Sequence, residues 1–147
     1  ILEYYIRHFP ELKVSASQIQ WSVDDGIRTM LPIMQSDIFI QKDSTVLIID
    51  AKYYSHTTQK QYDKHTIYSD NMYQIFTYVK NCDYEFGNRE HKVSGMLLYA
   101  RTDEEIQPDS VYHMHGNQIS VKTLDLNMPF KDIEKQLISI IKTHFDL

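Results

Sequence analysis

An unbroken apolar run ends in two charged residues in the segment Val46-Leu47-Ile48-Ile49-Asp50-Ala51-Lys52-Tyr53-Tyr54. The four aliphatic residues that open this segment predict a buried strand. On a strand, Asp50 and Lys52 would share one face and Ala51 would point to the other. An unpaired ion in such a setting is unstable, so it either finds a partner or changes its pKa. The two charges therefore indicate a functional site at the end of this strand.

A second carboxylate lies in the preceding strand-like segment, Ile33-Met34-Gln35-Ser36-Asp37-Ile38-Phe39-Ile40. The short polar linker between the two segments favours an antiparallel hairpin, and a two-residue loop at Asp43-Ser44 would place Asp37 opposite Asp50. Opposed carboxylates repel each other unless a cation lies between them. Hard oxygen ligands predict Mg²⁺, with Mn²⁺ as a substitute. The alternative is a surface ion pair in which Asp37 is a solvent-facing strand residue.

A predicted helix supplies further polar side chains. It reads Ser69-Asp70-Asn71-Met72-Tyr73-Gln74-Ile75-Phe76-Thr77-Tyr78-Val79-Lys80, with Ser69 or Asp70 as the N-cap. Gln74 and Tyr78 are four residues apart and therefore share one face of the helix. Gln74 could hold a phosphate, a water molecule or the lysine. The alternative is that the apolar residues of the helix are core and Gln74 has no role.

These residues together resemble a known superfamily. Asp37, the triplet Asp50-Ala51-Lys52 and the pair Gln74 and Tyr78 are similar to the PD-(D/E)xK nucleases, in the branch with a Q-x-x-x-Y helix. More closely, three blocks resemble the McrC family, the nuclease subunits of McrBC modification-dependent restriction systems. The three blocks are Leu31 to Ile38, Ile48 to Tyr54 and Asn71 to Tyr78. The resemblance runs from about Tyr4-Tyr5 to the strand at Gly95 to Tyr99.

The resemblance implies a Mg²⁺-dependent endonuclease that hydrolyses the phosphodiester bonds of double-stranded DNA. Asp37, Asp50 and the backbone carbonyl of Ala51 would hold the metal. Lys52 would orient or deprotonate the attacking water and stabilise the charge that develops on the phosphate. Gln74 would hold the far side of the site, and Tyr78 would support that helix.

The net charge of the chain bears on how it would meet DNA. With 15 basic and 20 acidic residues the formal net charge is −5, whereas a protein that binds DNA by itself usually has a basic surplus. The affinity for DNA is therefore expected to come mostly from a partner. This agrees with the resemblance, which implies a McrB-like AAA+ GTPase motor that recognises and moves the DNA.

The whole chain, residues 1–147, is expected to form a single α/β domain with a restriction-endonuclease-like core, a central mixed sheet flanked by helices. We expect helices over residues 1–9 and 129–145, strands over 13–23 and 93–100, a loop over 55–68 and a hairpin over 110–126. Because the chain starts at Ile1, it is expected to be the C-terminal part of a longer McrC-like chain without the N-terminal partner-binding region. With no signal peptide, no spanning apolar run and a lone Cys82, we expect a cytoplasmic protein with no membrane association.

Some features leave alternatives open. Many members of the superfamily add an acid from the first helix; here it would lie upstream of the chain, with Glu3 as the only local substitute. His113 and His115 are expected to be exposed hairpin histidines and not a metal pair, and Tyr53 and Tyr54 are candidates for base stacking. The alternative functions are a non-catalytic nuclease-fold scaffold and a RecB-like nuclease of another system.

Overall fold

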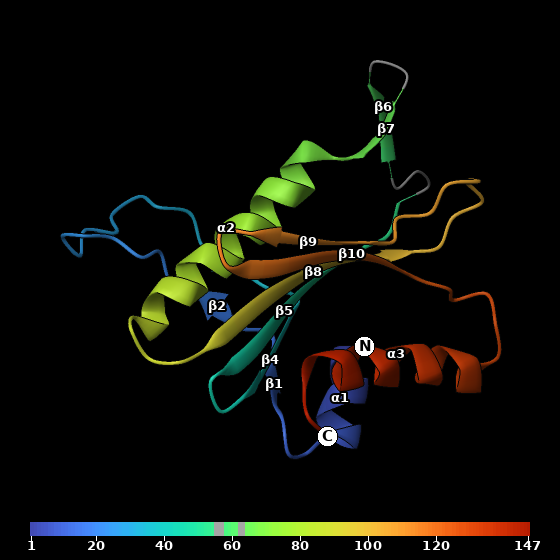
Figure 1. The fold of residues 1–147 in the computed structure, drawn as a ribbon, viewed down its shortest axis with the longest axis horizontal. Coiled ribbons are helices and arrows are strands. Elements are labelled where there is room, and N and C mark those ends of the chain that lie inside the picture. Colours follow the sequence, from blue (N-terminus) through green and yellow to red (C-terminus); the bar gives the residue numbers. More distant parts are fainter. Residues whose placement is uncertain (55–57, 62–63) are drawn as a thin grey trace.

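The computed structural model describes residues 1–54, 58–61 and 64–147 (Figure 1). The helices are α1 (Leu2–His8), α2 (Ser69–Phe86) and α3 (Phe130–His144). The strands are β1 (Lys13–Ser15), β2 (Gln18–Ile19), β3 (Met34–Gln35), β4 (Ile38–Lys42), β5 (Thr45–Lys52), β6 (Thr58–Gln61), β7 (Lys64–Ile67), β8 (Lys92–Ala100), β9 (Ser110–Met114) and β10 (Asn117–Leu124).

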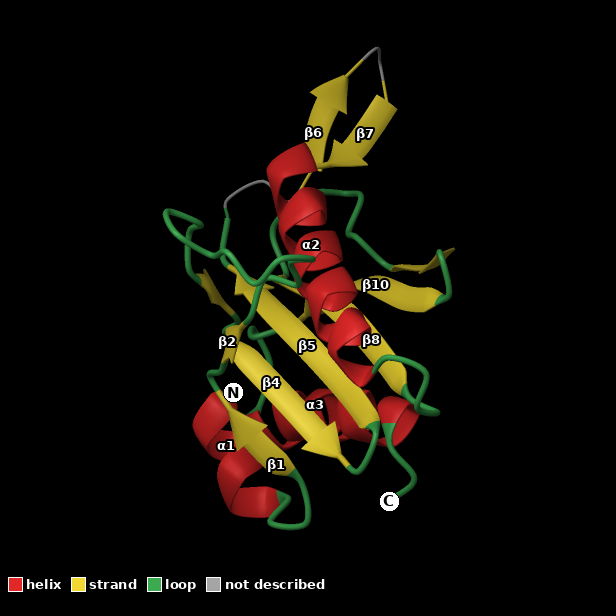
Figure 2. Cartoon of the chain, turned by 90° about the vertical axis from the view of Figure 1, so that its left-hand side faces the viewer, coloured by secondary structure: helices red, strands yellow, loops and turns green. Residues whose placement is uncertain are grey.

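A six-stranded mixed sheet forms the centre of the molecule, in the order β1-β4-β5-β8-β10-β9. β8 runs parallel to β5 and to β10, whereas the other neighbouring pairs are antiparallel. Parallel neighbours need a long connection, and here the chain crosses one face of the sheet through α2 between β5 and β8. α1 and α3 cover the other face (Figures 1 and 2). The predicted α/β fold, a mixed sheet flanked by helices, is confirmed.

The apolar run in β5 is continuous because both faces of this central strand are covered. Val46 and Ile48 pack in the cluster beneath α2, and Leu47 and Ile49 pack in the cluster shared with α1 and α3. Continuing this alternation, Asp50 lies on the α2 side of the sheet. The strand thus delivers the carboxylate to the helix that follows it in the chain.

The predicted hairpin register is confirmed along β4 and β5. Lys42 pairs with Thr45 across the loop Asp43-Ser44, and the last pair is Ile38 with Ile49. The prediction of one strand over residues 33–40 was wrong, because the chain changes sheets at its middle. Buried Ser36 bonds to the Ser17 carbonyl through its backbone N–H and its hydroxyl, so β3 pairs with β2 and β4 begins only after Asp37.

Three local predictions also differ from the structure. The expected strand over residues 13–23 is two short strands, β1 and β2, in different sheets. The expected loop over residues 55–68 contains the hairpin β6–β7, whose polar sequence gave no strand signal; residues 55–57 and 62–63 lie outside the described part. The N-cap of α2 is Tyr68, without a side-chain cap, because the N–H groups of Asn71 and Met72 bond to the Tyr68 carbonyl.

Gly95 lets α2 lie close to β8. A Cβ atom at this position would lie 2.6 Å from Val79 Cγ2 and 2.8 Å from Ile75 Cγ1, both on the buried face of α2. We therefore expect Gly95→Ala to lower the free energy of unfolding by about 1–3 kcal/mol, as overpacking of a core does. Urea denaturation would measure this loss, with Ser94→Ala in the same strand as a control that adds no atom. A change below about 0.5 kcal/mol in Gly95→Ala would show that the contact yields freely.

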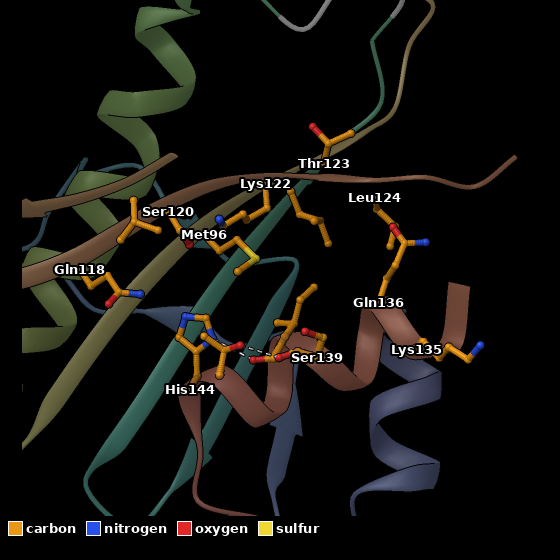
Figure 3. Close-up of a pocket in the computed structure, with 14 residues that line it drawn as sticks. Met96, Gln118, Ser120, Lys122, Thr123, Leu124, Lys135, Gln136, Ser139 and His144 are labelled. Carbon is orange, nitrogen blue, oxygen red and sulfur yellow. Dashed lines mark hydrogen bonds between the residues drawn. The ribbon is translucent and has the colours of Figure 1, made fainter. Parts of the chain in front are cut away.

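A cavity of about 480 Å³ lies between α3 and the sheet, on the face opposite Asp50 (Figure 3). His144 lines it from the last turn of α3. Its Nδ1 donates to the Ile140 carbonyl at 2.8 Å, whereas its Nε2 is buried without a hydrogen-bond partner among the described residues. Burial lowers the pKa of His144 below 6.5, and the charges of Lys92 and Lys122 act in the same direction, against the bond to Ile140.

This lowered pKa predicts a pH-dependent stability. Because the unfolded chain protonates His144 more readily than the folded one, folding is favoured above pH 6.5 and loses stability as the pH falls below it. His144→Asn, which keeps a donor near the Ile140 carbonyl, should reduce this dependence. Unfolding free energies of the wild type and variant between pH 8 and about 5 would test this. Parallel pH curves for the two proteins would contradict it.

Candidate active site

Asp50 is the most buried charge of the candidate site, with 2% of its surface exposed. Its Oδ2 lies 2.7 Å from the Lys52 ammonium, and apart from this ion pair the oxygen has no hydrogen-bond partner among the described residues. Burial raises the pKa of Asp50 to about 6, and neighbouring Asp37 adds to the rise, whereas Lys52 opposes it. The charged form of Asp50 is therefore disfavoured, and a bound cation would stabilise it.

Asp37 lies beside Asp50, as the hairpin register predicts. It is solvent-exposed and precedes β4, so it is not the strand residue that the sequence suggested. Its Oδ2 accepts a hydrogen bond of 2.8 Å from the backbone N–H of Ala51. This bond fixes one carboxylate oxygen over β5, and the neighbouring Asp37 helps to raise the pKa of Asp50.

Lys52 joins the strand to α2. Its Nζ donates to Gln74 Oε1 at 2.9 Å, and Gln74 Nε2 donates to the Tyr78 hydroxyl at 2.9 Å. The one-turn spacing on the helix thus brings Gln74 and Tyr78 together, with Gln74 directed at the lysine. Of the three partners that the sequence suggested for Gln74, the lysine is the one that it contacts in the structure.

The electrostatics of Lys52 bear on its chemistry. Burial by itself lowers the pKa of this ammonium, but the hydrogen bond and charge of Asp50, followed by the charges of Tyr54 and Asp37, reverse the effect and raise the pKa above 10.5. Lys52 is therefore a cation at neutral pH. It can orient and donate a proton to an oxygen, and electrostatic stabilisation suits it better than proton abstraction.

The donor set fits a hard divalent cation. Asp50 offers a buried oxygen whose one close partner is an ammonium, and Asp37 offers a second carboxylate beside it. The part of the chain that the structure describes holds no cluster of three or more His, Cys, Asp and Glu residues suited to a metal. Glu3 lies exposed on α1 and does not join the two carboxylates. Two carboxylates and a carbonyl would leave positions for water and substrate, as Mg²⁺ prefers.

A second polar group beside the site was not predicted. Buried Asn71 donates to the hydroxyl of buried Tyr99 at 2.9 Å and accepts from the Tyr54 hydroxyl at 3.4 Å. A signal was present, because Asn71 precedes Gln74 by three residues and so lies on the same face of α2. The contact with Tyr99 depends on the pairing of β8 with β5, which sequence patterns do not give.

The remaining candidates from the sequence are two tyrosines and two histidines. Tyr53 is 84% exposed, whereas Tyr54 packs edge-on against Tyr68 with ring centroids 5.9 Å apart, so only Tyr53 has a free ring. His113 and His115 are exposed on the β9–β10 hairpin, as expected. Among the described residues no helix is both long and apolar enough to cross a membrane.

Comparison with known proteins places the chain in a family. Residues 9–100 match the family described as McrBC 5-methylcytosine restriction system component. Over 143 residues the chain is 27% identical to the Type IV methyl-directed restriction enzyme EcoKMcrBC of Escherichia coli K12, spanning 95% of this chain and 40% of that protein.

A solved structure has the same fold. It is a half-complex from a tetradecameric assembly of Thermococcus gammatolerans McrB AAA+ hexamers with bound McrC, matched with a TM-score of 0.57 at 17% identity. The match covers 93% of this chain and 30% of the solved one. The family match contains both carboxylates, the lysine and the Gln74 helix. The chain therefore belongs to the McrBC 5-methylcytosine restriction system component family.

Proposed function

We propose that this chain is the nuclease part of its restriction system and cuts double-stranded DNA with the help of Mg²⁺. One observation carries the proposal: the buried Asp50 carboxylate faces Asp37 and has the Lys52 ammonium 2.7 Å away. A scaffold without chemistry gains nothing from this arrangement, because a buried carboxylate beside a second carboxylate weakens a fold. A site that binds a cation and a phosphate needs both signs of charge.

Asp37, Asp50 and the carbonyl of Ala51 would hold the metal. When bound, Mg²⁺ supplies a Lewis acid that polarises the phosphoryl group and favours ionisation of water. The chain positions these donors without it: the hydrogen bond from Ala51 N–H fixes Asp37, and β5 fixes Asp50.

Lys52 would act on the phosphate and on the attacking water. Its raised pKa keeps it positive, so it can stabilise the negative charge that grows on the phosphoryl oxygens. Gln74 would hold the ammonium in place through its Oε1, and Tyr78 would fix the orientation of the Gln74 amide through its hydroxyl. Gln74 and Tyr78 would thus position Lys52 and would not transfer protons.

A motor partner would bring the DNA. The formal charge of −5 disfavours independent DNA binding, and the solved relative of the same fold comes from an assembly with McrB AAA+ hexamers. We propose a McrB-like AAA+ GTPase as the partner of this chain. The chain spans only 40% of its Escherichia coli relative, so contacts with such a motor can involve other parts of the protein.

Metal titration tests the proposed site first. Isothermal titration of Mn²⁺ and Ca²⁺ should detect binding to the wild type and its loss in Asp37→Ala and in Asp50→Ala. Asp109→Ala is the matched control, because Asp109 is a surface acid paired with Lys122 away from the site. Equal binding by all four proteins would place the metal elsewhere. Absence of binding to the wild type would favour a non-catalytic scaffold.

A further inference from the structure

We propose that Asn71 is a positioning residue, which holds the start of α2 against the strand ends and thereby sets where Gln74 meets Lys52. The inference rests on the proposed nuclease function and assigns Asn71 no contact with the reacting atoms. It follows from three observations: the two bonds of the Asn71 amide, a first turn of α2 that no described side chain caps, and the spacing from Asn71 to Gln74.

The Asn71 amide joins the helix to two strand ends at once. Its Nδ2 donates to the Tyr99 hydroxyl in β8, and its Oδ1 accepts from the hydroxyl of Tyr54, two residues after β5 ends. Asn71 is 6% exposed and Tyr99 is fully buried. Tyr99 is also the register partner of Lys52 in the parallel pair β5–β8. The amide therefore ties α2 to the strand position directly beside the lysine.

The other contacts at the start of α2 are apolar or aromatic: Met72 packs against the core beneath the helix, and Tyr68 packs edge-on against Tyr54. Within the described residues no side chain caps the first turn of the helix, and the preceding hairpin β6–β7 projects away from the rest of the molecule (Figure 2). The close packing of α2 on Gly95 begins only at Ile75 and continues at Val79. Uncapped first turns fray readily. Asn71 is placed where it can prevent this fraying.

Gln74 would be affected first if the tie were lost. It lies one turn after Asn71, and its Oε1 must stay near 2.9 Å from Lys52 Nζ to hold the ammonium. Removing the Asn71 amide would also leave the buried Tyr99 hydroxyl without this partner, which favours local rearrangement. The carboxylates would keep their places, since Asp50 lies in β5 and Asp37 is bonded to Ala51. Loss of the Asn71 amide should therefore lower the turnover rate and leave metal binding unchanged.

The test uses the full natural protein reconstituted with its motor partner, duplex DNA and Mg²⁺. Asn71→Ala should lower kcat by roughly 10- to 100-fold, as small misplacements of active-site groups do, with little change in KM and in Mn²⁺ affinity. Asn81→Ala is the matched control: this asparagine lies on the same helix and also makes two hydrogen bonds, with Ser22 and Thr77. It should leave kcat unchanged. Equal losses of kcat in both variants would reduce Asn71 to a structural role.

A double-mutant cycle decides whether Asn71 acts through Gln74. In a Gln74→Ala background, Asn71→Ala should cause no further loss of kcat, whereas fully additive losses would overturn the proposal. Tyr99→Phe keeps the buried ring, removes only the hydroxyl that accepts from Asn71, and should reproduce part of the Asn71→Ala loss. It also serves as the test if Asn71→Ala does not fold.

Amide hydrogen exchange provides a readout that does not depend on cleavage. Asn71→Ala should speed exchange in the first turn of α2 and leave β5 unchanged, and equal protection in wild type and variant would overturn the proposal. If the reconstituted wild type fails to cut DNA, the nuclease function fails. The exchange experiment still tests the tie between Asn71 and the strands in that case.

Discussion

Asp50→Asn should abolish DNA cleavage without lowering the free energy of unfolding of the metal-free protein. The change removes the charge that would bind the metal, so the cleavage rate should fall by at least about 10²–10³-fold, the loss typical of removing one electrostatic group from an active site. Stability should hold because the wild-type carboxylate is buried beside Asp37, and burial with this like charge raises its pKa to about 6. A neutral side chain of the same shape avoids both costs.

Two measurements on the same protein check this result. Cleavage of duplex DNA is measured in the reconstituted complex, and urea unfolding is measured in EDTA with and without added Mn²⁺. Metal should stabilise the wild type by binding only the folded state, and it should not stabilise Asp50→Asn. Asp83→Asn is a suitable control, because Asp83 bonds to His91 and Asn117 at the other end of α2. Retained cleavage in Asp50→Asn would remove Asp50 from the site.

The candidate site was more predictable than the fold details around it. The pairing of Asp37 with Asp50 follows from a short polar loop and a period of two, both of which are local properties. The helix spacing of Gln74 and Tyr78 is local too. The hairpin register and the helix spacing can therefore be predicted without knowledge of tertiary structure. In the structure, the residues from the hairpin and from the helix lie together.

The errors arose where tertiary contacts overrode local patterns. The segment 33–40 has apolar residues at both ends and therefore predicts one strand, but burial of Ser36 against Ser17 divides it between two sheets. The hairpin β6–β7 was missed because its sequence is mostly polar and lacks the apolar residues that mark a strand. Asn71 was missed because its partner Tyr99 is 28 residues away, in a strand whose pairing with β5 is parallel and non-local.

Lys52→Met should abolish cleavage, as Asp50→Asn does, but its effects on the free energy of unfolding and on metal affinity should be the opposite. Methionine keeps the length and the apolar stem of the lysine and removes only the ammonium. Cleavage should again be lost, because the cation beside the phosphate is gone. The metal-free protein should be less stable by about 1–3 kcal/mol, because the buried Oδ2 of Asp50 loses the ammonium that neutralises it. Metal binding should become tighter, because the ammonium 2.7 Å from Asp50 no longer competes with the ion.

The two variants therefore distinguish the role of Asp50 in binding the metal from the role of Lys52 in stabilising charge on the phosphate. Isothermal titration with Mn²⁺ should show no binding to Asp50→Asn and a higher affinity in Lys52→Met than in the wild type. Added Mn²⁺ should also restore the unfolding free energy of Lys52→Met, because the cation replaces the missing charge beside Asp50. If Lys52→Met instead binds the metal more weakly, the lysine organises the carboxylates and does not compete for them. Its place would then be among the residues that shape the metal site, beside the Ala51 N–H that holds Asp37.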